Sequence, residues 1–159
     1  MNRLLLAVSL VLFGGAQAIA GVDSMDLGST SVDSTGGGTV TVTGASSGDL
    51  QGFVISVSHD SAVITLDSID ILGTDADIAG AEFVVPTTYA DGGTIGVVLD
   101  FNAPYDGQVI SGGSGLSLAN YNYSCNNAVF YTEGEAAPAA EVSALSFVDG
   151  VYGSPALTN

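Results

Sequence analysis

The chain has 159 residues, a length that suits one domain. Its 17 Asp and Glu side chains are opposed by a single Lys or Arg, which gives a formal net charge of −16 at pH 7. Binding to nucleic acid or to an anionic lipid surface depends on Lys and Arg, so the composition argues against both partners. We expect partners that are neutral, cationic or joined through a metal ion; the alternative is that the acidic surface serves only solubility.

The N-terminus has the three parts of a secretory signal peptide. Arg3 supplies the positive start, residues 4–13 form an apolar run, and residues 16–18 have the small-x-small pattern that signal peptidase recognises. The run is about half the length of a membrane span, which needs roughly 20 apolar residues. We therefore predict a signal peptide over residues 1–18, with cleavage after Ala20 as the second choice. The mature domain would be secreted or held at the cell surface, without membrane insertion.

The mature part, residues 19–159, shows the period-two alternation of β-strands and almost no helix signal. Turns rich in Gly, Asp and Ser separate the alternating segments, and these residues tolerate positive φ. Such segments indicate an all-β domain of two packed antiparallel sheets. The predicted strands cover residues 39–43, 52–58, 62–71, 82–85, 94–101, 109–110, 116–124 and 141–148.

Alternation also predicts which side chains face the core. Over residues 52–58, Phe53, Ile55 and Val57 should point inward, while Val54 and its even-numbered neighbours should point outward. The segment over 94–101 is strongly apolar and is expected to be a central strand.

Two later strands carry more specific expectations. The strand over 82–85 should end at Pro86, because proline cannot donate to a β-ladder. Over residues 116–124, Leu118 should lie on the face opposite Tyr121 and Tyr123. Residues 133–140 are expected to form a loop. From Asp149 the chain carries turn residues and then stops, so we expect the domain to be truncated at its C-terminus.

Residues 49–66 resemble the early strands of cohesin domains. Gly52-Phe53 matches the glycine–aromatic start of an alternating strand in that family, residues 59–61 take the place of the following turn, and residues 63–66 match the next strand. Further matches lie at 38–42 and 94–101. The resemblance extends over about residues 21–159, and it implies a jelly-roll-like β-sandwich of about nine strands, similar in fold to certain carbohydrate-binding modules.

The resemblance also implies a function. Cohesins dock dockerin modules, which are small calcium-binding pairs of helices, so the leading hypothesis is extracellular, non-catalytic docking of a protein such as a dockerin-like module. The docking face would be the outward side of Gly52, Val54, Ser56 and Ser58. The side chains of Gly52 and Val54 cannot hydrogen-bond, and there the chain departs from the family's pattern.

Two alternatives remain open. A carbohydrate-binding module could use Tyr121 and Tyr123, which lie two residues apart on one strand face, as a platform for stacking a polysaccharide; otherwise both rings belong to the core. The third hypothesis is a structural module of a surface layer or of a larger exported protein.

Catalytic and metal-binding patterns are weak. His59 is the only histidine and lies in a predicted turn, no nucleophile elbow precedes a helix, and the chain has no Trp to line a glycosidase cleft, so we predict that the protein is not an enzyme. Asp75 and Asp77 place carboxylates close together and are the candidate calcium ligands; the alternative is a solvated acidic loop. No other cofactor is expected.

Overall fold

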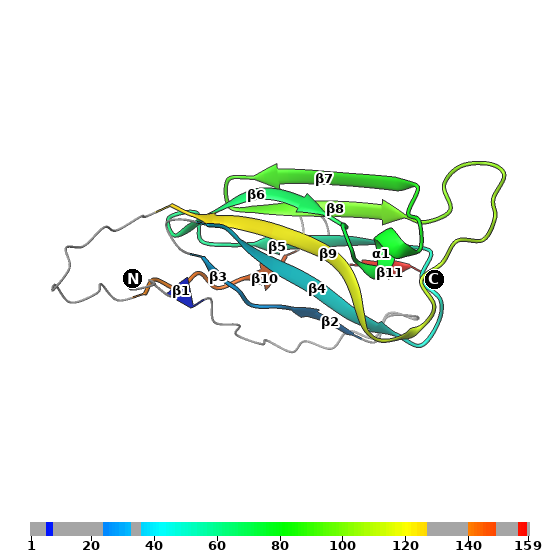
Figure 1. Cartoon of the computed structure of the whole chain (residues 1–159), viewed down its shortest axis with the longest axis horizontal. Helices are drawn as coiled ribbons and strands as arrows, with labels where there is room; N and C mark the ends of the chain where they lie inside the picture. Colours follow the sequence, from blue (N-terminus) through cyan, green and yellow to red (C-terminus); the bar gives the residue numbers. More distant parts are fainter. Residues whose placement is uncertain (1–5, 8–23, 33–35, 127–139, 149–155, 159) are drawn as a thin grey trace, which may run out of the picture.

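The computed structural model describes residues 6–7, 24–32, 36–126, 140–148 and 156–158, and its regular structure there is almost entirely β (Figure 1). One antiparallel sheet has the order β2 (Ser24–Leu27), β4 (Gly38–Ser46), β9 (Gly113–Cys125), β6 (Ile64–Asp70). The other has the order β10 (Ser146–Phe147), β5 (Gly52–Ser58), β8 (Gly92–Val98), β7 (Phe83–Tyr89), and β11 (Ala156–Thr158) also pairs with β5. The predicted two-sheet β-sandwich is confirmed.

A third, very small sheet joins β1 (Leu6–Ala7) to β3 (Ser31–Val32). Because β1 falls inside the segment predicted to be the signal peptide, cleavage after residue 18 would remove this pairing and leave both larger sheets intact.

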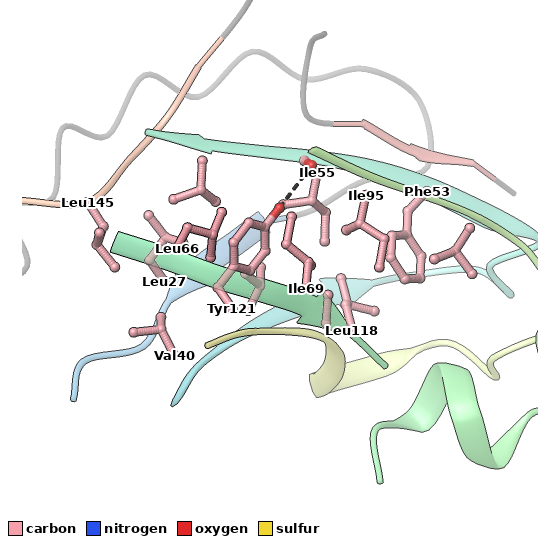
Figure 2. Close-up of a cluster of buried hydrophobic side chains, with 14 of the residues drawn as sticks. Leu27, Val40, Phe53, Ile55, Leu66, Ile69, Ile95, Leu118, Tyr121 and Leu145 are labelled. Atoms are coloured by element: carbon pink, nitrogen blue, oxygen red, sulfur yellow. Dashed lines mark hydrogen bonds between the residues drawn. The ribbon is translucent and has the colours of Figure 1, made fainter. Parts of the chain in front are cut away.

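The core lies between the two larger sheets (Figure 2). Phe53, Ile55 and Val57 are all buried, which confirms the inward face predicted for β5. Across the core, the hydroxyl of Tyr121 on β9 donates to the backbone carbonyl of Ile55 at 3.0 Å. A strand of one sheet is thereby hydrogen-bonded to a strand of the other through the interior.

β9 does not keep a single alternation along its length. Val42 pairs with Ala119 and Thr43 with Ser117, so Leu118 is an extra residue opposite β4. An extra residue of this kind is a β-bulge, and it reverses which parity faces inward. Leu118 is therefore buried together with Tyr121, and the prediction that they lie on opposite faces is wrong.

The fourth predicted strand is longer than expected. β7 runs through Pro86, which pairs with Ile95 of β8, and it continues to Tyr89. The prediction that this strand ends at Pro86 is wrong because β7 is the outermost strand of its sheet, where a missing ladder donor is tolerated (Figure 1). β8 lies between β5 and β7, as expected for a central strand.

Other predicted strands are shorter. Residues 109–110 contribute only a bridge between Ile110 and Leu50, and within residues 141–148 the strand is limited to β10. A short helix, α1 (Asp75–Ile78), follows β6 and begins after Thr74, whose side chain caps it by accepting from the backbone N–H of Asp77. The loop predicted over 133–140 lies, apart from residue 140, outside the described residues.

Candidate docking surface

The outward side of β5, β8 and β7 forms a continuous surface of four cross-strand rows, here termed the outer plateau. Alternate residues of β5 and β8, including Ile55 and Ile95, are buried in the core, and Val84 of β7 packs against it, so the residues between them face outward. The register places those residues side by side in rows that run from β7 across β8 to β5. The rows are Phe83–Val98–Gly52, Val85–Gly96–Val54, Thr87–Thr94–Ser56 and Tyr89–Gly92–Ser58.

No side chain of the outer plateau carries a charge, although the chain has 17 acidic residues. Instead, four large apolar side chains are exposed in its first two rows: Val54 (37%), Phe83 (38%), Val85 (45%) and Val98 (37%). Contiguous exposed apolar side chains of this kind mark interaction surfaces on soluble proteins.

The middle of the second row has no side chain. A Cβ atom built on Gly96 would meet, among the described residues, only Cγ2 of Val54 at 4.0 Å, which is an ordinary van der Waals contact. The space above Gly96 is therefore open, and it lies between the valine side chains of Val85 and Val54.

An aromatic pair closes the first end of the outer plateau. The rings of Phe83 and Phe101 stack with their centroids 4.6 Å apart and their planes at 29°. The carboxylate of Glu82 accepts a hydrogen bond from the backbone N–H of Phe101 at 2.8 Å and another from that of Asn102. These backbone contacts fix the position of Phe101 against the edge of the sheet.

The predicted binding residues of β5 occupy this surface unequally. Val54 is exposed and Ser58 is half-buried, but Gly52 and Ser56 are buried. Ser56 hydrogen-bonds to Thr94 at 3.0 Å on one side, and its carbonyl accepts from Val148 on the other. Neighbouring segments therefore enclose Gly52 and Ser56, and of the four predicted residues of β5 only Val54 and Ser58 have exposed or half-buried side chains.

Sequence reasoning missed the part of the surface that β7 and β8 contribute. Phe83, Val85 and Val98 were not named as binding residues, because the strand containing Phe83 and Val85 was expected to be short and to end at Pro86. A signal was present, since residues 83–85 are all apolar and do not alternate as a strand with one wet face would.

Tyr121 and Tyr123 do not form a platform. Their side chains are 0% and 1% exposed, and burial raises the pKa of both hydroxyls. Tyr123 packs edge-on against the ring of His59, with centroids 5.4 Å apart, and its hydroxyl has no hydrogen-bond partner within the part of the chain described. Both tyrosines belong to the core, so neither can stack against a sugar.

The carboxylates of Asp75 and Asp77, the candidate calcium ligands, both accept hydrogen bonds from nearby residues of the protein. The carboxylate of Asp75 accepts from both the backbone N–H and the hydroxyl of Ser117, at 2.6 and 2.8 Å, and ties α1 to β9. The carboxylate of Asp77 accepts from the backbone N–H of Gly73 at 2.8 Å. Across the described ranges, no group of three or more His, Cys, Asp or Glu side chains is placed to hold a metal ion.

The outward side of the other sheet is different in kind. On it, polar side chains of β4, β9 and β6 hydrogen-bond to one another: Thr41 donates to Asn120 at 2.9 Å, and Asn120 donates to Asp70 at 3.2 Å. The next row repeats the pattern, with Thr39 donating to Asn122 and Asn122 to Asp70. This face is therefore polar, and its side chains hydrogen-bond to one another, in contrast to the outer plateau.

Among the described residues, no helix is long and apolar enough to cross a membrane.

Comparisons with known proteins add no family to this description. No protein-family model matches the sequence, and no curated protein matches it.

Proposed function

We propose that the protein is an exported, non-catalytic binding module that docks a partner protein through the outer plateau. The observation that carries the proposal is the group of exposed apolar side chains, Val54, Phe83, Val85 and Val98, on a surface without charge. The centres of protein–protein interfaces are likewise depleted of charged residues and enriched in apolar ones. The chain is strongly acidic, yet none of the four rows carries a charge. Such a surface is expected where a partner protein excludes water.

The side-chain types favour a protein partner over a polysaccharide. Sugars bind flat aromatic faces, whereas three of the four apolar side chains exposed in the first two rows are valines, and the fourth row adds a single exposed tyrosine, Tyr89. Phe83 has one ring face occupied by Phe101, and the tyrosine pair that suggested sugar binding is buried. Support is therefore weaker for the carbohydrate-binding alternative.

The resemblance to cohesins supports the same surface. The glycine–aromatic strand of that resemblance is β5, and its outward residue Val54 contributes to the second row of the outer plateau. We retain a dockerin-like module as one candidate partner, and export by the predicted signal peptide would place the outer plateau outside the cell.

The test makes the same substitution at two glycines, one on each sheet. Gly96→Gln puts a polar side chain into the open space of the outer plateau, and Gly113→Gln does the same at an exposed position on β9 of the other sheet, where the added Cβ would meet only Leu116 at 3.6 Å. Both proteins and the wild type are immobilised and exposed to the secreted fraction of the source organism.

We expect one or more proteins to be retained by the wild type and by Gly113→Gln, and to be lost with Gly96→Gln. Thermal unfolding of all three proteins is recorded as the folding control. Retention that is equal on Gly96→Gln and on the wild type would refute docking through the outer plateau.

A further inference from the structure

We infer that the partner of the outer plateau presents an apolar patch with Lys or Arg side chains at both of its ends. This inference rests on the proposed docking function, and it follows from where the acidic side chains lie around the uncharged surface.

The end of the outer plateau near Phe83 is acidic. Glu82 directly precedes Phe83, and its backbone N–H donates to the carbonyls of Val98 and Leu99 at 3.2 and 3.3 Å, which places it beside the end of β8. Asp100 follows two residues after Val98, and its carboxylate accepts a hydrogen bond from the backbone N–H of Gly107 at 2.9 Å. A partner that covers the first row therefore lies close to the carboxylate of Glu82, which accepts from the backbone N–H of Phe101, the residue stacked on Phe83.

The opposite end is acidic as well. Asp91 lies in the turn between Tyr89 and β8, and its carbonyl accepts from the backbone N–H of His59 at 3.0 Å. That hydrogen bond brings the β5–β6 turn, with the exposed Asp60, next to the β7–β8 turn. Both carboxylates lie close enough to His59 to raise its pKa against the larger, opposing effect of burial.

No positive charge offsets these groups. The single Lys or Arg of the sequence is Arg3, so the described part of the chain carries none. A second copy of the chain also has a net charge of −16, so two copies would repel each other. A partner with cations at both ends gains attraction at the rim while its apolar centre covers the valines, and complementary charge of this kind directs association and selects partners.

The size of the surface fixes the probe. From the Phe83 row to the Tyr89 row is six residues of β7, or about 20 Å, and the three strands span about 10 Å. A synthetic helical peptide of about four turns has these dimensions. One peptide carries leucines along one face and lysines at both ends; its comparator has glutamine in place of every lysine.

Binding of each peptide to the full chain is measured at about 50 mM and about 500 mM NaCl, concentrations between which exposed charges become strongly screened. We expect the lysine peptide to bind at least ~10-fold more tightly than the glutamine peptide at low salt, as several rim charges act together. High salt should reduce this difference. Gly96→Gln should weaken both peptides.

Substitutions at the rim separate local from overall charge. Glu82→Gln keeps an acceptor oxygen for Phe101, and Asp91→Asn removes the charge at the other end; each should weaken only the lysine peptide, by ~2–5-fold, the range of exposed ion pairs. The matched control is Asp26→Asn on β2, an exposed position in the other sheet, which should leave both affinities unchanged.

The outcomes distinguish the two proposals. Equal binding of both peptides that Gly96→Gln still weakens would overturn the inference of a basic partner and leave docking by the outer plateau standing. If Asp26→Asn weakens binding of the lysine peptide as much as Asp91→Asn does, the effect is due to overall charge. That result would overturn the inference. Failure of the lysine peptide to bind at low salt would also overturn it, while the capture experiment separately decides the docking function.

Discussion

Gly96 and Val54 lie side by side in one row of the outer plateau, yet the nearest atom that a Cβ on Gly96 would meet is Cγ2 of Val54 at 4.0 Å. The neighbouring Gly93 faces the opposite way. A Cβ there would lie 2.6 Å from Cδ2 of Leu66 and 2.7 Å from Cδ1 of Ile69, which is inside the core. Gly96 and Gly93 of β8 thus mark the outer and inner sides of its sheet.

This contrast predicts opposite effects of the same substitution. Gly93→Ala should lower the free energy of unfolding by ~1–3 kcal/mol, because the added methyl overpacks the core. Gly96→Ala should leave it unchanged or raise it by up to ~1 kcal/mol, since glycine weakens a strand. Urea denaturation of the two variants checks both. Equal destabilisation by the two substitutions would contradict the assignment of faces.

A second pair tests the two sides of β5. Phe53→Ala should cost ~3–5 kcal/mol of stability, the usual range for a buried aromatic residue, because Phe53 is 2% exposed. Val54→Ala, at the next position, should change stability by no more than ~0.5 kcal/mol, as for exposed sites. Chemical denaturation provides both values, and a neutral Phe53→Ala would show that the inward face of β5 is misassigned.

The two buried tyrosines should respond differently to loss of their hydroxyls. Tyr121→Phe removes the donor to the carbonyl of Ile55 and should destabilise by ~1–2 kcal/mol. In Tyr123→Phe, the lost hydroxyl has no partner within the described residues, so stability should be unchanged or higher. Thermal unfolding compares the two, and a larger loss for Tyr123→Phe would be contrary to this arrangement.

Stability should fall in mild acid through His59. Burial lowers the pKa of its imidazole below the ordinary 6.5, and the Ala90 backbone and the carboxylates of Asp91 and Asp60 only partly oppose this effect. The unfolded state therefore takes up a proton as the pH falls through 6.5, before the native state does. Between 6.5 and the lower native pKa, this difference reduces the free energy of unfolding, by at most about 1.4 kcal/mol per pH unit.

Comparison with His59→Gln isolates this contribution from the relief of repulsion among the carboxylates, which both proteins share. As the pH falls below 6.5, the free energy of unfolding of the wild type should fall relative to that of the variant. A difference that stays constant between pH 7.5 and 5 would contradict a buried, neutral His59.

Local alternation was enough to predict much of this fold. β5 has the bounds expected for it, Gly52–Ser58, and its inward residues are those that the period-two pattern selected. The pattern failed where pairing between distant strands decides the outcome. A bulge opposite β4 places Leu118 in the core, and nothing near Leu118 in the sequence indicates which strand it will face.

The candidate site was predictable only in part for the same reason. Val54 was recognised as outward, but the burial of Ser56 depends on β8 and on the segment that ends at Val148, neither of which adjoins it in sequence. The outward residues of β7 were missed because the effect of Pro86 depends on the position of its strand in the sheet. At an edge it is tolerated, and Phe83 and Val85 then complete the surface.

Amide hydrogen exchange of the protein, alone and with a partner captured by the wild type, tests docking by the outer plateau most directly. We predict slower exchange in residues 83–98, which cover β7 and β8, and unchanged exchange in β4 and β9. Slower exchange confined to residues 38–46 and 113–125, on the polar face of the other sheet, would contradict the account.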